Sequence, residues 1–205
     1  MTATTHRLFP RRFFLLSLGL LLALTANANL LLNGNFRGDA NNDGVADQWR
    51  PDTSAGLEGE YAVTEEDGRS CQKLILRAPL KTMQIFRVSQ DNIPAKPGKH
   101  FLLTGAVKAE ATARVYFYEF LQDGTYLTHA VTNKKQGWQD VNLLIKTTPQ
   151  CRSFKLSLLA VDADKPVWFS DFSIVDLEAP PRQRAPQLAA APPLTADWKD
   201  RKSTR

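Results

Sequence analysis

The chain has 205 residues, of which 43% are hydrophobic and 23% charged, and its formal net charge is +5 at pH 7. The basic excess lies at the two ends, because residues 29–178 contain 17 basic and 19 acidic residues. A nucleic-acid-binding domain carries its basic excess on the folded part, so the composition argues against nucleic acid as a partner. The middle of the chain, about 150 residues, is long enough for one domain with a sizeable core.

The first 28 residues have the order of features that is typical of a secretory signal peptide. A basic start precedes an apolar run at residues 13–24, and small residues follow. The run is shorter than the roughly 20 residues that a membrane-spanning helix needs, so we expect cleavage after Ala28, with an uncleaved anchor as the alternative. The mature protein is then secreted, periplasmic or at the cell surface, with no membrane span. The prediction depends on Arg7, Arg11, Arg12, Ala26 and Ala28.

The stretch GDANNDGVADQW, residues 38–49, has the spacing with which an EF-hand loop begins. Its twelfth position is Arg50, where a calcium loop has a bidentate glutamate. The alternative is a polar turn, which aspartate and asparagine also favour. A bound Ca2+ ion would be structural, fixing the loop and seating Trp49 against the core. The expected ligands are Asp39, Asn41, Asp43, Asp47, the carbonyl oxygen of Val45 and, from outside the loop, Asp171.

Seven short segments between residues 71 and 177 are rich in β-branched, leucine and aromatic residues, as strands are. Turn residues separate them, and none carries the apolar stripe of an amphipathic helix. The sequence therefore predicts an all-β fold, a jelly-roll β-sandwich of about 8–9 antiparallel strands. The segments are CQKLILRAP, KTMQIFRVS, KHFLLTGAVKAE, TARVYFYEFL, WQDVNLLIKT, RSFKLSLLAV and VWFSDFSIVDL.

The chain contains two cysteines, Cys71 and Cys151, both in the predicted domain. An even number of cysteines in an exported protein favours a disulfide. Such a bond would close a loop of about 80 residues and stabilise the fold by roughly 4 kcal/mol. The alternative is two separate buried thiols.

Four motifs, in this order along the chain, resemble carbohydrate-binding modules of the family 4/9/22 type, which are galactose-binding-like jelly rolls: NLLLNGNF with DGVADQW, IPAKPGKHFLLTGAVKAE, GWQDVNLLIKTTP and VWFSDFSIVDL. The resemblance covers residues 29–177. It implies a polysaccharide or oligosaccharide ligand, bound on one sheet face or at edge loops, and buried positions for Trp49 and Trp138. Arg37 stands where the family often has a glutamate that helps to hold a structural calcium ion.

A sugar-binding surface needs aromatic platforms together with side chains that exchange hydrogen bonds with hydroxyl groups. In RVYFYEF, the period of two places Tyr116 and Tyr118 on one side of a strand and Val115 and Phe117 on the other. The alternative is that these tyrosines only cover the sheet. Trp168 is open between packing and platform. The further candidates for the carbohydrate site are Gln84, Arg87, Glu119 and Tyr126.

The sequence contains no catalytic motif with a recognisable mechanism. A glycosidase needs two carboxylates roughly 5 to 9 Å apart across its substrate, and Glu110 and Glu119 lie in no such pattern. His100 and His129 accompany no nucleophile elbow. We therefore expect a non-catalytic carbohydrate-binding protein. The alternatives are a structural or adhesion module that binds a protein, and a small glycan-active hydrolase or lyase.

The last 27 residues, 179–205, are rich in proline and alanine and contain six basic and two acidic residues. A segment of this composition buries too little apolar surface to offset the entropy of ordering it. We expect a disordered tail or tether, through which a protein partner could be engaged.

Overall fold

The computed structural model describes residues 28–110 and 112–177. The predicted signal peptide, apart from its last residue, and the predicted tail lie outside these ranges, and so does Glu178 at the end of the predicted domain. Within them the chain forms ten antiparallel strands and no helix, so no helix there is long and apolar enough to cross a membrane. The strands are β1 Arg50–Thr53, β2 Gly59–Glu66, β3 Arg69–Leu76, β4 Phe86–Pro94, β5 His100–Ala109, β6 Ala113–Leu121, β7 Tyr126–Asn133, β8 Gly137–Lys146, β9 Cys151–Ala160 and β10 Val167–Leu177.

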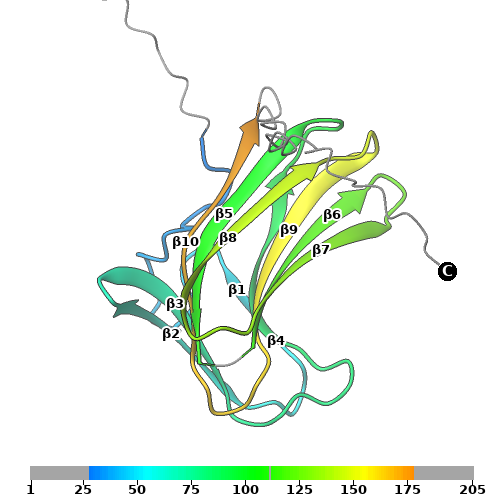
Figure 1. The fold of residues 1–205 in the computed structure, drawn as a ribbon. Coiled ribbons are helices and arrows are strands. Elements are labelled where there is room, and N and C mark those ends of the chain that lie inside the picture. The colour runs from blue at the N-terminus through cyan, green and yellow to red at the C-terminus, as the bar shows by residue number, and fades with distance from the viewer. Residues whose placement is uncertain (1–27, 111, 178–205) are drawn as a thin grey trace, which may run out of the picture.

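The strands form two five-stranded sheets that pack face to face (Figure 1). Sheet A has the order β1-β4-β9-β6-β7, and sheet B has the order β2-β3-β10-β5-β8. Strands from distant parts of the chain lie side by side, since β10 is inserted between β3 and β5. This arrangement confirms the predicted all-β jelly roll, with one or two strands more than expected.

The core lies between the sheets and is built by strict alternation along the strands. On β6, Val115 and Phe117 point inward and are at most 2% exposed, while Tyr116 and Tyr118 between them are half-buried on the other side. Phe154 of β9 joins the two sheets, because its ring packs against Phe101 of β5 at 4.9 Å and Phe117 of β6 at 4.6 Å between centroids. Burial of one such ring stabilises the fold by about 2–3 kcal/mol.

The segment before β1 closes one end of the sandwich. Phe36 and Trp49 pack together at 5.1 Å, and Trp49 is only 6% exposed. The expectation that Trp49 is buried in the core is therefore confirmed. Gly34 lies so close to β10 that a Cβ atom there would be 2.1 Å from the carbonyl oxygen of Phe172. A side chain at this position would push the segment away from the sheet.

Three irregularities in strand pairing interrupt the ladders. The register shifts between Gln90 and Ile93 on β4, between Phe120 and Leu121 on β6, and between Ser170 and Ser173 on β10. Two of the irregularities contain a residue with positive φ. On β4 this residue is Asn92, with a φ of 55°, and on β10 it is Asp171, with a φ of 54°. β-Bulges bend a strand and redirect side chains, and two of these three lie at one end of sheet A.

The predicted disulfide is not formed, because Cys71 and Cys151 are both free thiols in buried positions. Cys151 begins β9 and belongs to the core between the sheets. Cys71 lies on β3, where Leu74 and Leu76 face the core, so alternation places its side chain on the outer side of sheet B. Its thiol donates a hydrogen bond to the carbonyl oxygen of Arg69 at 3.1 Å. The sulfur atoms lie on different sides of sheet B, and the alternative of two buried thiols describes the structure.

Candidate functional site

The outward side of sheet A carries a continuous group of aromatic and charged side chains, and we call it the sheet A face. Its side chains point outward because side chains alternate along each strand. On β4, Phe86 and Val88 point into the core and Arg87 points outward. On β6, Tyr116 and Tyr118 point outward in the same way. The outward residues are Arg50 and Asp52 of β1, Arg87, Ser89 and Asp91 of β4, Ser153, Lys155 and Ser157 of β9, Arg114, Tyr116, Tyr118 and Phe120 of β6, and Tyr126 and Thr128 of β7.

Aromatic rings form a row across β6 and β7. The ring centroids of Tyr116 and Tyr118 are 6.0 Å apart, and Tyr118 meets Tyr126 edge-on at 5.6 Å. Phe120 extends the row, with 5.7 Å between its centroid and that of Tyr126. Tyr126 is 57% exposed. Such a row offers solvent-accessible apolar surface whose edges carry hydroxyl groups, which is what the flat faces and hydroxyl rims of sugars can use.

Arginine side chains hold two of these tyrosines in place. Nη1 of Arg87 donates a hydrogen bond to the hydroxyl group of Tyr118 at 3.2 Å, and Nη1 of Arg114 does the same for Tyr116. Burial raises the pKa of the Tyr118 hydroxyl group above its ordinary value, and Arg87 opposes this only in part. The Tyr118 hydroxyl group therefore stays protonated at neutral pH and can donate a hydrogen bond.

A network of ion pairs crosses β1, β4 and β9, beside the aromatic row on the same face. Asp52 accepts hydrogen bonds from Nε and Nη2 of Arg87 at 2.8 and 2.5 Å. Lys155 lies between the two carboxylates, 3.2 Å from Asp91 and 3.8 Å from Asp52. Asp91 also pairs with Arg50. Three cations thus share two carboxylates, and Arg87 is held rigidly where it meets Tyr118.

A cavity of about 330 Å³ opens at the end of this face where the irregularities of β4 and β6 meet. The extra residue opposite the shift on β6 is Arg152, since Phe120 pairs with Ser153 and Leu121 with Cys151. Arg152 is exposed and forms no ion pair within the part of the chain that the structure describes. The cavity is lined by Arg50, Asp91, Asn92, Phe120, Arg152 and Ser153.

Three predicted carbohydrate-site residues, Glu119, Gln84 and Trp168, do not lie on this face. Glu119 alternates inward with Phe117, is 1% exposed, and accepts hydrogen bonds from the backbone N–H and the hydroxyl group of Thr148, both at 2.7 Å. Gln84 precedes β4, which begins only at Phe86, and its side chain closes a turn by accepting a hydrogen bond from the backbone N–H of Lys81 at 2.8 Å. Glu119 thus anchors a loop, and Gln84 belongs to a turn and not to a strand.

Trp138 of β8 and Trp168 of β10 lie on the outer side of sheet B, away from the sheet A face. Trp168 is 7% exposed, and Nζ of Lys108 lies 5.2 Å from its ring, so its role is packing and not a platform. Trp138 was expected in the core, but alternation on β8 turns it outward, where it is half-buried. Its ring lies 4.9 Å from the Arg69 guanidinium, and its Nε1 donates to Asp67 at 3.0 Å.

The acidic loop at residues 38–49 is held together by its own side chains. Asp39 accepts hydrogen bonds from the backbone N–H groups of Asp43 and Gly44 at 3.2 and 3.0 Å, and Asp43 accepts one from Val45 at 2.8 Å. Asp47 accepts one from Ala40 at 3.1 Å, and Nδ2 of Asn41 donates to Asp43 at 2.9 Å. These are the bonds of a polar turn. The predicted loop ligands are thus close to one another, and several of their oxygens accept hydrogen bonds from the loop backbone.

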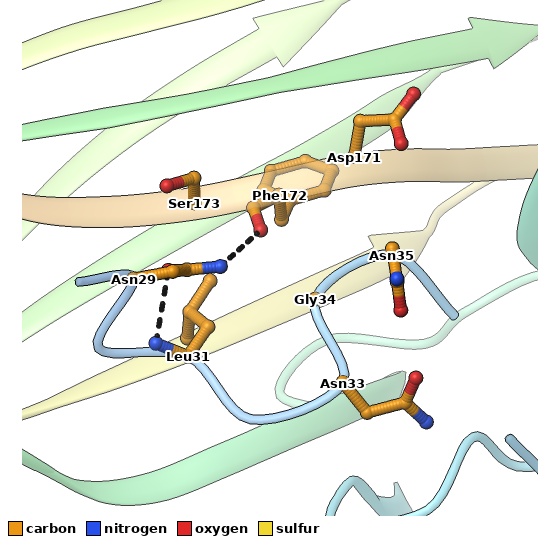
Figure 2. Close-up of a pocket in the computed structure, with 8 residues that line it drawn as sticks. All are labelled: Asn29, Leu31, Asn33, Gly34, Asn35, Asp171, Phe172 and Ser173. Atoms are coloured by element: carbon orange, nitrogen blue, oxygen red, sulfur yellow. Dashed lines mark hydrogen bonds between the residues drawn. The ribbon is translucent and has the colours of Figure 1, made fainter. Parts of the chain in front are cut away.

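Asp171, the predicted ligand from outside the loop, borders a different cavity. This cavity, of about 370 Å³, lies between residues 29–35 and the irregular part of β10, where Asn29 bonds to the backbone of Leu31 and Phe172 (Figure 2). Asp171 lies 3.6 Å from Nη1 of Arg69. In residues 28–110 and 112–177 no group of three or more His, Cys, Asp or Glu side chains is placed to bind a metal ion. The arrangement does not bring the predicted ligand set together.

Gln72 is a structural residue that the sequence did not reveal. It is fully buried on β3, its Oε1 accepts a hydrogen bond from the backbone N–H of Ala46 at 2.8 Å, and its Nε2 donates to the carbonyl oxygen of Gly44 at 2.9 Å. It therefore ties the acidic loop to sheet B. Alternation with Leu74 and Leu76 could have placed its amide inward, but the sequence did not show which backbone groups it would satisfy.

No family model matches the chain, and no curated protein matches it. Solved structures of similar shape were found. The enzymatically active domain of tailspike protein 4 of bacteriophage CBA120 is 12% identical, with a TM-score of 0.55 over 73% of this chain, which spans only 21% of that protein's length. A carbohydrate-binding module of family 4 is 17% identical, with a TM-score of 0.55 over 71% of this chain and 99% of its own.

A xylan-binding domain of carbohydrate-binding-module family 22 from Paenibacillus barcinonensis is 16% identical, with a TM-score of 0.51 over 76% of this chain and 98% of its own. At such identities the likeness concerns the fold, and the two modules match it over nearly their whole length. The chain therefore has the jelly-roll fold of the carbohydrate-binding modules of families 4 and 22, as the sequence motifs predicted.

Proposed function

We propose that this chain is an exported, non-catalytic carbohydrate-binding protein that holds a polysaccharide or oligosaccharide on the sheet A face. The observation that carries this proposal is the row of Tyr116, Tyr118 and Tyr126, two of which are hydrogen-bonded to arginines. Export rests on the sequence of residues 1–28. The similar domain from Paenibacillus barcinonensis binds xylan, which supports the ligand class for the fold but names no ligand for this chain.

The sheet A face has the two kinds of group that sugar binding requires. The tyrosine rings supply apolar surface for the sugar rings, and the arginine and tyrosine polar groups at the ring edges exchange hydrogen bonds with hydroxyl groups. Arg87 is fixed by two hydrogen bonds to Asp52 before any ligand arrives. Binding then costs little side-chain entropy at this position, and such preorganisation favours affinity.

The carboxylates of this face are poorly suited to glycoside hydrolysis. A glycosidase needs one carboxyl group that stays protonated and acts as general acid. Burial by itself would raise the pKa of Asp91, but the hydrogen bond from Arg50 and the nearby Lys155 outweigh it, and the pKa is lowered. Asp52 forms ion pairs with Arg87 and Lys155. Both groups serve to position cations, which supports the non-catalytic assignment.

The test is affinity electrophoresis of the chain from residue 29 to residue 205 in gels that contain β-glucan, xylan, mannan or galactan. Tyr118→Ala is expected to weaken retardation by one glycan class about 10-fold, because burial of roughly 60 Å² of apolar surface between a sugar and the ring is worth about 1.5 kcal/mol. Trp138→Ala, which changes an aromatic residue on the outer side of sheet B, is the matched control and should bind normally. Mobility unaffected by any glycan class would favour the alternative of an adhesion module.

Calcium binding at residues 38–49 stays a prediction from the spacing of Asp39, Asn41 and Asp43. Calorimetry on chelator-treated protein measures it directly. A bound ion is expected to raise the melting temperature and to do so less in Asp43→Ala, since each lost oxygen ligand weakens the site. Absence of binding heat together with an unchanged melting temperature would establish the loop as a polar turn that needs no metal.

A further inference from the structure

The cavity at the end of the sheet A face carries a net positive charge, because two arginines and one aspartate line it. It is lined by Arg152, which lies beside Phe120 at the irregularity between β6 and β9. Asn92, from the irregularity in β4, lines the same cavity. The other arginine of the cavity, Arg50, is already paired with Asp91. Arg152 is the guanidinium of this cavity that no carboxylate of the described residues neutralises.

The sheet A face as a whole carries more cations than the carboxylates that pair with them. Arg50, Arg87 and Lys155 share Asp52 and Asp91, which leaves the network one positive charge in excess. Arg114 and Arg152 add two more, and neither forms an ion pair within the part of the chain that the structure describes. The excess is local, because residues 29–178 together contain 17 basic and 19 acidic residues.

We propose that the ligand of this face is an acidic glycan, a chain that contains uronic acid residues, whose carboxylates are bound by Arg152 and Arg114. This inference rests on the proposed function. A neutral glycan would leave two guanidinium groups beside it without a counter-charge, whereas a carboxylate can pair with the planar fork of a guanidinium through two parallel hydrogen bonds. Phe120 lies beside Arg152 in the cavity and offers an apolar surface to the sugar ring that carries the carboxylate.

The positions of the two arginines indicate an extended ligand. Arg114 lies near the start of β6, and the cavity with Arg152 lies beside Phe120 near its end. Six residues of a strand span about 20 Å at ~3.3 Å per residue. Tyr116 and Tyr118 occupy the interval between them. The ligand is therefore a chain of several sugars that crosses the aromatic row and carries carboxylates at both ends of the contact, not a single uronic acid.

The experiment measures the affinity of the chain from residue 29 to residue 205 for oligomers of galacturonic acid, for neutral β-glucan oligomers and for dextran sulfate, by calorimetry at two salt concentrations. Because residues 179–205 are basic, attraction to an anionic chain does not by itself support the proposal. Arg152→Gln is expected to weaken binding of the uronate oligomer about 10-fold and to leave any neutral binding unchanged. Arg114→Gln is also expected to weaken uronate binding about 10-fold, but it removes the hydrogen bond to Tyr116 as well, so the comparison with neutral oligomers relies on Arg152→Gln. Arg77→Gln removes a positive charge just after the end of β3, outside the sheet A face. It is expected to leave the affinity for the uronate oligomer unchanged.

Two outcomes would overturn the acidic-glycan assignment: equal affinity for neutral and uronate oligomers, or an equal loss in all three arginine variants, which indicates unspecific attraction. Binding of dextran sulfate that is tighter than that of the uronate oligomer, and that Arg152→Gln weakens at least as much, would overturn the choice of carboxylate over sulfate. Tyr118→Ala separates this inference from the proposed function. If no glycan binds, both fail, whereas a neutral glycan whose binding depends on Tyr118 but not on Arg152 leaves the proposed function standing and refutes the inference.

Discussion

Gln72 shows how much one buried amide can contribute to this fold. Its side chain is fully buried, and it satisfies the backbone N–H of Ala46 and the carbonyl oxygen of Gly44, with longer contacts of 3.3 Å to the carbonyl oxygens of Ala62 and Lys73. Buried backbone groups without a partner are costly. The acidic loop can therefore lie against sheet B because this one side chain replaces the water that the loop backbone loses.

We predict that Gln72→Leu lowers the free energy of unfolding by about 3 kcal/mol. The substitution keeps the apolar volume but leaves one buried donor and one buried acceptor without a partner, each of which costs about 1–3 kcal/mol. Urea denaturation followed by tryptophan fluorescence measures the change. Gln150→Leu, at an exposed position in the turn before β9, is the control and should alter stability by no more than about 0.5 kcal/mol. Similar effects of the two substitutions would refute the anchoring role of Gln72.

At the scale of strands, the ion-pair network ties β1, β4 and β9 together across sheet A. Its central carboxylate, Asp91, lies in the irregular part of β4 and pairs with Arg50 and Lys155. Burial alone would raise the pKa of Asp91, but these two cations outweigh it and the pKa is lowered. A carboxylate whose pKa is lower in the folded state contributes stability above its unfolded pKa and loses that contribution as the pH falls through the folded value.

The Asp91 contribution to stability is therefore expected at neutral pH and should disappear below the unfolded value of about 3.9, as the carboxylate becomes protonated. Asp91→Asn should be less stable than the unmodified protein by about 1 kcal/mol at pH 7, since solvent screens the network, and the difference should shrink towards pH 3. Urea denaturation at several pH values measures it. Asp140→Asn, an exposed aspartate on β8, provides the control. A difference that is independent of pH would contradict the ion-pair explanation.

Three strands, β1, β2 and β7, were missing from the sequence-based prediction, and their place in the sheets explains why. Strands β1, β2 and β7 all lie at sheet edges. Their sequences RPDT, GEYAVTEE and YLTHAVTN contain few large apolar residues. An edge strand has one neighbour and often one solvated side, so its apolar pattern is weak. The edge strand β8 was recognised because Val141, Leu143 and Ile145 alternate towards the core.

At the scale of the whole molecule, the sandwich keeps its two cysteines apart and unreactive. Burial raises the pKa of Cys71 to about 11 and that of Cys151 to about 12. The reactive species of a cysteine is the thiolate, and at neutral pH both side chains are therefore neutral thiols. The stability of the domain depends on its core and not on a covalent link between the sheets.

We predict that a thiol reagent labels neither cysteine in the native protein at pH 7 and labels both after denaturation. The melting temperature should be the same with and without a reducing agent, because there is no bond to reduce. The loss of a native disulfide typically costs 2–5 kcal/mol, so a clear drop in melting temperature on reduction would contradict the structure. A mass two hydrogens below that of the dithiol form would do so as well.

The sequence by itself determined the fold class and the orientation of side chains on individual strands. Alternation is a local property of an extended chain, because successive side chains point to opposite sides. For this reason Tyr116 and Tyr118 could be placed on the side opposite Phe117 from their spacing alone. The same rule, applied strictly, already turns Glu119 inward with Phe117, and its hydrogen bonds to Thr148 agree with that.

The tertiary structure decided which distant residues meet. Arg87 reaches Tyr118 across 31 positions of sequence, and Arg50 reaches Asp91 across 41. These contacts depend on strand order and register, which long-range pairing sets. The irregularities that bring Asn92 and Arg152 to one cavity, and the placement of Cys71 and Cys151 on different sides of sheet B, have the same origin. Local spacing carries no information on such contacts, because they exist only when the two sheets are assembled.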